Sequence, residues 1–158
     1  MNKNYLEIIS YEPRYRSSFK ILNVAWLEKF FHVEPIDEEV LSNPENILLE
    51  GGHIFFARYQ DTIIGTCALL KTEPTKFELS KMAVDEKFHG LGVGRQLLET
   101  AIRHYRTYPG CTLFLETNSL LKPAIALYES VGFSHGPRPL GPSHYVRANV
   151  YMAYMRTD

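Results

Sequence analysis

One stretch, from Glu78 to Leu98, constrains the fold of this chain more than any other. Its first residues form an apolar run typical of a buried strand, and Gly90, Gly92 and Gly94 follow before apolar residues at helical spacing. Glycines between a strand and a helix let the backbone approach a ligand closely and adopt positive φ. The helix also directs its unpaired N–H groups toward that loop. The stretch therefore predicts an anion site, with phosphate as the expected ligand.

The length and composition of the chain predict one globular domain. Its 158 residues are enough to bury a substantial core, and 45% hydrophobic with 22% charged residues are close to globular averages. A formal net charge of -1 gives no overall field that would attract nucleic acid or an anionic membrane. The N-terminal residues lack the apolar core of a signal peptide, and no apolar run approaches transmembrane length. We therefore expect one cytoplasmic domain over residues 1–158, with neither nucleic acid nor membrane as a partner.

The cysteines and histidines predict neither a disulfide framework nor a metal site. Cys67 and Cys111 lie in separate apolar runs, which is typical of reduced core residues. The six histidines show no H-x-x-x-H or H-E-x-x-H spacing. We therefore expect no metal in the functional site.

The periodicity of apolar residues predicts an α/β, or mixed α+β, fold. Three strands joined by short turns imply an antiparallel meander, and the strand–helix–strand unit from Phe77 to Leu115 implies a right-handed parallel crossover. The expected order is β-α-α-β-β-β-α-β-α-β-β, in a central mixed sheet with helices on both faces. The expected strands cover residues 5–10, 53–59, 62–70, 77–84, 111–115 and 145–155. The expected helices lie within residues 14–31, after an Asp37 cap and before Pro44, after the glycine loop, and between Pro123 and Gly132.

Two common phosphate-binding loops fit the glycines poorly. The dinucleotide fingerprint G-x-G-x-x-G fits Gly90 and Gly92, but its third glycine position holds Arg95. A Walker loop requires G-x-x-x-x-G-K-[ST], and no such run occurs.

The run HGLGVG, residues 89–94, resembles motif A of the GNAT superfamily of acyl-CoA-dependent N-acetyltransferases, whose pattern is [R/Q]-x-x-G-x-[G/A]. It matches both glycine positions and departs at His89, where the family usually has Arg or Gln. Further along the chain, Ala124, Tyr128 and the pair Gly132-Phe133 reproduce the family's A-x-x-x-Y-x-x-x-G-F spacing. The resemblance implies the GNAT fold and acetyl-CoA as co-substrate.

The resemblance also implies how acetyl-CoA is held. The glycine loop would cradle the pyrophosphate through backbone N–H groups. Strand residues would pair with the pantetheine arm through their main chain, and a bulge there would supply the N–H facing the thioester carbonyl. Many members carry Asn at the position of Leu121, and Asn118 is a candidate replacement for that contact. The implied coenzyme-binding residues are Met82, Ala83, Val84, His89, Gly90, Leu91, Gly92, Val93, Gly94, Arg95, Asn118, Ala124 and Tyr128.

Two catalytic residues follow from the same resemblance. Tyr128 matches the tyrosine that protonates the departing coenzyme A sulfur, although its spacing alone also fits an aromatic that packs on the sheet. Glu78 matches the position of a general base, and its apolar neighbours would raise its pKa. The alternative for Glu78 is a carboxylate at the strand edge that is simply solvated, or that is paired with Lys76 or Lys81. Glu116, at the end of the next strand, is the reserve candidate for the base.

The expected activity is direct transfer of an acetyl group from acetyl-CoA to a primary amine in a ternary complex. The acceptor is a small-molecule amine or a peptide amine, and the resemblance also allows a homodimer. A non-catalytic acyl-CoA-binding or sensor domain of the same fold is the alternative. The candidate walls of the acceptor pocket are His144, Tyr145, Arg147 and Asn149 near the C-terminus, and Trp26, Phe30, Phe31 and Glu34 in the first helices.

Overall fold

The structure is a computed structural model that describes residues 2–139 and 141–156. Its strands are β1 Leu6–Ser10, β2 His53–Tyr59, β3 Thr62–Glu73, β4 Lys76–Val84, β5 Thr112–Thr117, β6 Phe133–Gly136 and β7 Val150–Tyr154. Its α-helices are α1 Arg16–Phe30, α2 Pro35–Ser42, α3 Pro44–Leu49, α4 Val93–Tyr105 and α5 Lys122–Ser130. Short 3-10 helices cover Lys3–Tyr5, Pro13–Tyr15 and Glu86–Phe88. The prediction of one domain over residues 1–158 extends to positions 1, 140 and 157–158, which lie outside the described residues.

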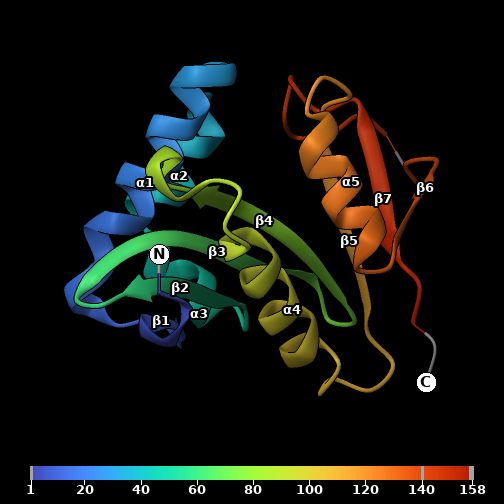
Figure 1. Ribbon diagram of the computed structural model, residues 1–158. Coiled ribbons are helices and arrows are strands. Elements are labelled where there is room, and N and C mark those ends of the chain that lie inside the picture. Colours follow the sequence, from blue (N-terminus) through green and yellow to red (C-terminus); the bar gives the residue numbers. More distant parts are fainter. Residues whose placement is uncertain (1, 140, 157–158) are drawn as a thin grey trace.

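The strand ladders confirm the predicted mixed sheet, whose order is β1-β2-β3-β4-β5-β7-β6 (Figure 1). β1 to β4 pair in sequence as an antiparallel meander, and β5, β7 and β6 form a second antiparallel group. The two groups meet at the parallel pair β4 and β5, in which Lys76–Glu78 lies opposite Thr112–Phe114. Beyond that short pairing the two strands separate (Figure 1). The sheet is therefore open between the carboxyl-terminal halves of β4 and β5.

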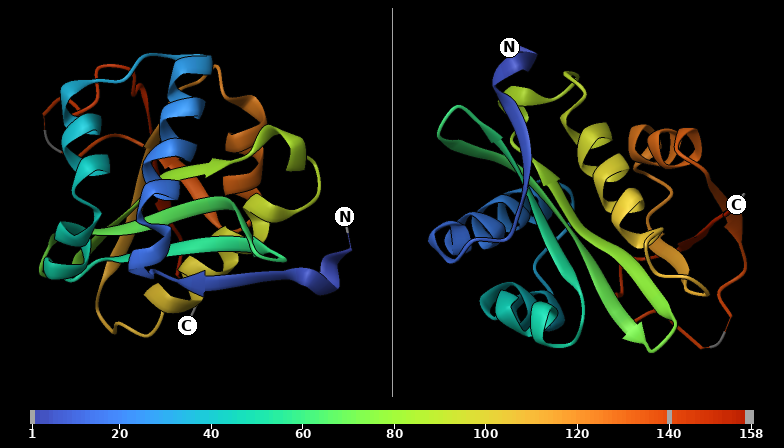
Figure 2. Two further views of the ribbon diagram at one scale, coloured as in Figure 1. Left: turned by 90° about the vertical axis from the view of Figure 1, so that its left-hand side faces the viewer. Right: turned by 90° about the horizontal axis from the view of Figure 1, so that it is seen from below.

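Helices cover both faces of the sheet, as expected. α1, α2 and α3 lie on one face, and α4 and α5 lie on the other (Figure 2). α4, the helix after the glycine loop, buries the whole apolar face that its spacing predicted. That face consists of Val93, Leu97, Leu98, Ala101, Ile102 and Tyr105. Fully burying a leucine stabilises a fold by about 2 kcal/mol, so this face holds α4, and the loop at its N-terminus, against the sheet.

The segment between α1 and β2 differs from the expectation in two ways. The structure adds one helix, α3, which begins at Pro44, directly after the residue where the preceding helix was expected to end. Proline fits the first turn of a helix, because the N–H that it lacks has no partner there. The second difference is the cap of α2. Glu34 is its N-cap, and Asp37 lies in the first turn, where its Oδ2 accepts from Glu34 N at 3.0 Å.

The expected last strand from Tyr145 to Met155 is shorter in the structure. β7 begins at Val150, and the preceding residues form a loop. The N–H groups of Val146 and Arg147 donate to the Glu34 carboxylate at 2.9 and 3.4 Å. This carboxylate therefore accepts the backbone hydrogen bonds that a paired strand would otherwise accept. This segment, residues 137–139 and 141–149, is called the β6–β7 loop below.

The two cysteines are free thiols, one buried in β3 at Cys67 and one half-buried before β5 at Cys111. Cys67 therefore lies in the core as expected, whereas Cys111 is partly buried against it. Within residues 2–139 and 141–156, no helix combines the length and the apolar composition that a bilayer crossing requires.

Candidate active site

The glycine loop has the backbone geometry that its sequence predicted. Gly90 and Gly92 adopt φ of 77° and 83°, in the left-handed region that favours glycine. Gly92 is the N-cap of α4, so the loop leads directly into the helix N-terminus. A Cβ at either glycine would meet no protein atom within 4 Å, so the outer side of the loop is open. The N-terminus of α4, whose first N–H groups have no partner within the helix, therefore lies beside open space, as an anion site requires.

A pocket of about 470 Å³ lies over this loop. It is bounded by the end of β4, by the glycine loop with the first turn of α4, and by the first half of α5. Ten of the thirteen predicted coenzyme residues line it: Met82, Ala83, Val84, His89, Gly90, Gly92, Val93, Gly94, Arg95 and Ala124. The predicted residue Leu91 does not line it, and Asn118 and Tyr128 line a different pocket.

His89 is held against the end of β4. Its Nε2 lies 2.8 Å from the carbonyl oxygen of Val84. Because a carbonyl oxygen only accepts, this nitrogen carries a proton. His89 therefore fastens the loop to the strand through its Nε2–H group.

A β-bulge interrupts β4 beside the same pocket. The register between β3 and β4 shifts between Thr66 and Ala68, which pair with Ala83 and Ser80. Lys81 lies within this bulge with φ of 54°, a left-handed conformation that a residue with a side chain adopts only when its surroundings hold it there. The structure thus contains the bulge that the resemblance implied.

A second, smaller pocket of about 90 Å³ lies in the opening between β4 and β5. Leu79 to Met82 form one side and Leu115 to Asn118 form the other, and residues of α1, α5 and the β6–β7 loop complete it. Trp26 and Met82 line both pockets. The two pockets therefore adjoin at the bulge of β4.

Tyr128 reaches the second pocket from α5. Its ring packs edge-on against Phe133, with centroids 6.2 Å apart, and so contacts the core. Tyr128 is therefore a packing aromatic as well as a residue of the pocket lining. Its hydroxyl forms no hydrogen bond with any described residue. Burial, with the nearby Cys67 adding to it, raises the pKa of Tyr128 to about 12. The phenol therefore keeps its proton at neutral pH and can donate it into the pocket.

Glu78 is the last residue of β4 that pairs with β5, and it is only 7% exposed. Burial, followed by the charge of Glu116, raises its pKa to about 7, while Lys81 opposes the rise. The alternative of a solvated carboxylate at the strand edge is wrong, because the side chain is buried. Glu78 does not itself line the second pocket.

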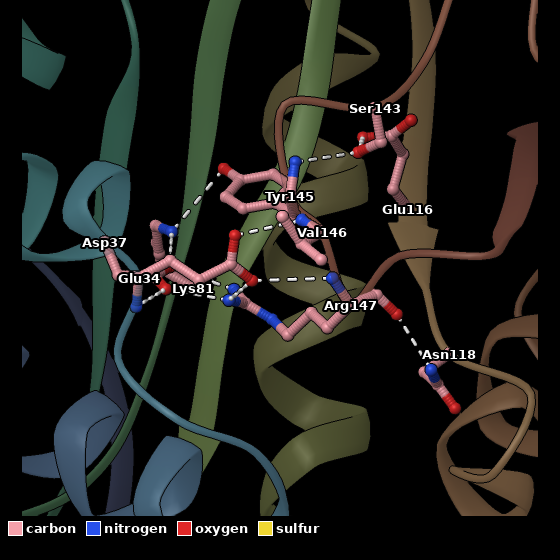
Figure 3. A network of polar contacts seen from close by, with 9 residues as sticks. All are labelled: Glu34, Asp37, Lys81, Glu116, Asn118, Ser143, Tyr145, Val146 and Arg147. Atoms are coloured by element: carbon pink, nitrogen blue, oxygen red, sulfur yellow. Dashed lines mark hydrogen bonds and ion pairs between the residues drawn. The ribbon is translucent and has the colours of Figure 1, made fainter.

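Glu116, the reserve candidate, does line the second pocket. Its Oε1 accepts from Arg138 Nε at 2.6 Å, and its Oε2 accepts from Ser143 Oγ at 2.6 Å. Both donors belong to the β6–β7 loop. Glu116 therefore fastens that loop to the end of β5 (Figure 3).

A buried ionic network forms the floor of the second pocket, and Figure 3 shows it from close by. Lys81 Nζ lies 2.9 Å from Asp37 Oδ1, and the Arg147 guanidinium donates to both oxygens of Asp37 at 2.7 and 2.9 Å and to Glu34 Oε2 at 3.0 Å. Burial alone would raise the pKa of Asp37, but the hydrogen bond from Arg147 and the charge of Lys81 lower it to about 2. The network joins the bulge of β4, the start of α2 and the β6–β7 loop.

Sequence reasoning did not place Lys81 and Asp37 in the site. A lysine within the apolar run of a strand was the available signal, because a buried lysine needs a carboxylate partner. The identity of that partner, 44 residues away in the chain, could not be read from spacing.

The other predicted pocket residues divide into two groups. Trp26, Phe31, Tyr145 and Arg147 line the second pocket. Phe30, Glu34, His144 and Asn149 do not, and Phe30 is 44% exposed. Asn118 lines the pocket, but its Nδ2 donates to the carbonyl oxygen of Arg147 at 2.8 Å, so part of its amide connects β5 to the β6–β7 loop.

Comparison with known proteins assigns this chain to a family of acetyltransferases. The chain belongs to the Acetyltransferase (GNAT) family, whose sequence model matches residues 18–133. It is 32% identical over 96 residues to the N-alpha-acetyltransferase RimI of Mycobacterium tuberculosis. The matched segment covers 59% of this chain and 55% of that protein. The chain spans 23% to 63% of the lengths of the first three curated relatives that it matches.

Solved structures have the same fold. An acetyltransferase of the GNAT family from Staphylococcus aureus superposes with a TM-score of 0.84 at 22% identity, over 94% of this chain and 98% of that chain. A structure of yncA from Salmonella typhimurium with its cofactor acetyl-CoA has a TM-score of 0.76 at 17% identity, over 97% and 94% of the two chains. That structure shows acetyl-CoA bound to a protein of the same fold. In the part of the chain that the structure describes, no group of three or more His, Cys, Asp or Glu side chains could hold a metal ion.

Proposed function

We propose that this protein transfers the acetyl group of acetyl-CoA directly to a primary amine in a ternary complex. The observation that carries the proposal is the adjoining of two pockets at the bulge of β4, where Trp26 and Met82 line both. A thioester in the larger pocket and an amine in the smaller one would meet there without a covalent enzyme intermediate. Holding both reactants in contact removes much of the entropic barrier to their reaction. Residues from both halves of the sheet line the pockets, so we also propose that the whole chain forms one domain.

The larger pocket fits acetyl-CoA. The N–H groups between Gly90 and Gly94 and the positive end of α4 suit a pyrophosphate. Beyond Glu78, β4 has no ladder partner on its β5 side among the described residues, so its main-chain groups are open on that edge. The pantetheine arm, which carries two amide groups, can pair there as an added strand does.

The proposed reaction begins when the amine nitrogen attacks the thioester carbonyl carbon. The carbonyl oxygen gains negative charge, which a main-chain N–H at the bulge would stabilise. The carbon–sulfur bond then breaks, and the sulfur takes its proton from the Tyr128 hydroxyl. The nitrogen loses one proton, so the products are an N-acetyl amide and the free thiol of coenzyme A.

We assign Glu78 as the final acceptor of the amine proton. A pKa near 7 suits a general base at neutral pH, because the group is partly ionised and still basic enough to take a proton. Glu78 lies outside the lining of the acceptor pocket, so the proton would reach it through water. Glu116 lines the pocket and is the alternative acceptor, although Arg138 and Ser143 already bind its two oxygens.

Release of free thiol from acetyl-CoA, measured over a panel of amines, tests the proposal. We expect thiol release to depend on the amine and to be matched by an N-acetyl product in mass spectrometry. Calorimetric binding of acetyl-CoA without thiol release for any amine would favour a non-catalytic binding domain instead.

A further inference from the structure

Arg147 uses only part of its guanidinium inside the protein. Its side chain lines the second pocket and is 17% exposed. Nη1 donates to Asp37 Oδ2 at 2.7 Å and to Glu34 Oε2 at 3.0 Å, and Nη2 donates to Asp37 Oδ1 at 2.9 Å (Figure 3). A guanidinium carries five N–H groups. Two of them, one on Nε and one on Nη2, therefore have no partner among the described residues.

The two remaining N–H groups of Arg147 lie side by side. Asp37 occupies the edge of the guanidinium that Nη1 and Nη2 form, because each of its oxygens binds one of these nitrogens. The second N–H of Nη2 therefore points the same way as the N–H of Nε. Two parallel N–H groups of this kind match the two oxygens of a carboxylate. This pair is called the free edge of Arg147 below.

The free edge is open and is not enclosed in the core. Among the described residues, no buried side-chain nitrogen or oxygen lacks a hydrogen-bond partner. Nε of Arg147 has no such partner, so it is not buried. The opposite edge is covered by Asp37, whose side chain is 0% exposed. The free edge is therefore the part of the guanidinium that a ligand in the second pocket can reach.

The charges around Arg147 leave room for one more anion. Arg147 and Lys81 share the carboxylates of Asp37 and Glu34, so these four charges cancel. Glu116, the other carboxylate in the lining, is paired with a cation of its own. A ligand carboxylate at the free edge would therefore meet a neutral lining and two charge-assisted N–H donors.

We infer that the acceptor is an amino acid, a small molecule that carries a carboxylate as well as the primary amine, and that the free edge of Arg147 binds this carboxylate. The inference rests on the proposed function, because it assigns the second pocket to the acceptor. Two parallel hydrogen bonds would fix the orientation of the acceptor, so that its amine can point toward the bulge of β4, where the two pockets adjoin.

Matched acceptors test the inference on the wild-type protein. L-alanine, L-phenylalanine, β-alanine and 4-aminobutanoate are each compared with the corresponding amide by thiol release, with kcat/KM expressed per unprotonated amine. We expect an acid to be preferred to its amide by at least about 10-fold, because the amide loses a charge-assisted pair of hydrogen bonds. The acid with the largest preference identifies the spacing between amine and carboxylate. Equal or better use of the amide in every pair would overturn the inference while leaving acetyl transfer intact.

A carboxylate without an amine tests the free edge apart from acetyl transfer. With the protein saturated by coenzyme A, 3-phenylpropanoate should bind at least about 10-fold more tightly than 3-phenylpropanamide in calorimetry. Tighter binding of the amide would overturn the inference, whatever the result for thiol release. Absence of thiol release with every amine would overturn the proposed function itself.

A variant tests the residue responsible. Arg147→Lys keeps a positive charge beside Asp37 but cannot offer two parallel N–H groups. Its kcat/KM for the preferred acid should fall by at least about 10-fold, whereas the value for the matching amide should change by less than about 3-fold. Arg14→Lys, which alters an exposed arginine, is the control and should leave both values unchanged. Equal losses with acid and amide would overturn the assignment, because they would show that Arg147 acts only through the ionic network.

Discussion

Lys81 Nζ lies 2.9 Å from Asp37 Oδ1, and the two side chains are 4% and 0% exposed. This ion pair holds the bulge of β4 against the first turn of α2. Arg147, from the β6–β7 loop, binds the same carboxylate. One buried carboxylate thus connects the proposed site of the thioester carbonyl to the loop that closes the acceptor pocket.

Asp37→Asn should lower the free energy of unfolding by about 3 kcal/mol, because two buried cations lose their shared partner. Lys81→Met should lower it by less, since Asp37 keeps Arg147. Urea denaturation measures both values. Glu38→Gln breaks the exposed pair with Lys20 and should cost much less than Asp37→Asn. If Asp37→Asn were no more costly than Glu38→Gln, the network would not stabilise the fold.

His89→Ala should change the affinity for acetyl-CoA only about 2- to 3-fold, because His89 binds the Val84 carbonyl and the cradle acts through main-chain N–H groups. Gly92→Ala should weaken the same affinity by at least about 10-fold, since a left-handed conformation strains alanine by about 1 to 2 kcal/mol. Isothermal titration calorimetry compares the two. A larger loss in His89→Ala than in Gly92→Ala would show that the imidazole contacts the phosphates directly.

The stability of the protein should fall as pH rises from about 4.5 to about 7, through Glu78. Its pKa is about 7 in the folded protein and 4.5 in an unperturbed glutamate, so the unfolded chain loses its proton first as pH rises. Ionisation therefore favours the unfolded chain across this interval, by about 3 kcal/mol in total. Glu78→Gln should remove that component, measured as the difference between urea unfolding at pH 4.5 and pH 8. The exposed carboxylate of Glu73, changed to Gln, is the control. An identical pH dependence in wild type and Glu78→Gln would contradict the burial of this charge.

The pH dependence of kcat/KM should report the same group. If Glu78 accepts the proton, activity falls below pH 7 as its carboxylate becomes protonated. Glu78→Gln should lose this acidic limb together with most of the activity. An acidic limb that survives in Glu78→Gln and disappears in Glu116→Gln would transfer the role of base to Glu116.

The parts of the site that the sequence predicted are encoded by local spacing. The glycines at positions 90 and 92 and the apolar face of α4 lie within one continuous segment, so their geometry follows from turn and helix preferences. The preceding helix ends before Pro44 as predicted, but α3 was not predicted, because proline can also begin a helix. The same reasoning extended the last strand through Tyr145, since nothing local shows that Glu34 would bind the backbone of the β6–β7 loop.

The parts that the sequence did not predict depend on the opening between β4 and β5. Asp37, Lys81 and Arg147 meet only because these strands separate after Glu78 and the β6–β7 loop closes over the gap. The sequence left open whether Glu78 is desolvated or solvated, and its long-range pairing with β5 is what removes it from solvent. Long-range pairing of this kind leaves no signal in the spacing of one sequence.

The measurement that most directly tests acetyl transfer in these pockets is single-turnover thiol release by Tyr128→Phe with an accepted amine. Loss of the proton donor to the sulfur should lower the rate by about 100-fold. The affinity for acetyl-CoA, measured by calorimetry, should stay within about 2-fold, since the hydroxyl acts mainly as the thiolate leaves. Tyr5→Phe, which changes an exposed tyrosine outside both pockets, is the control and should react as the wild type does. An unchanged rate in Tyr128→Phe would contradict the proposed mechanism.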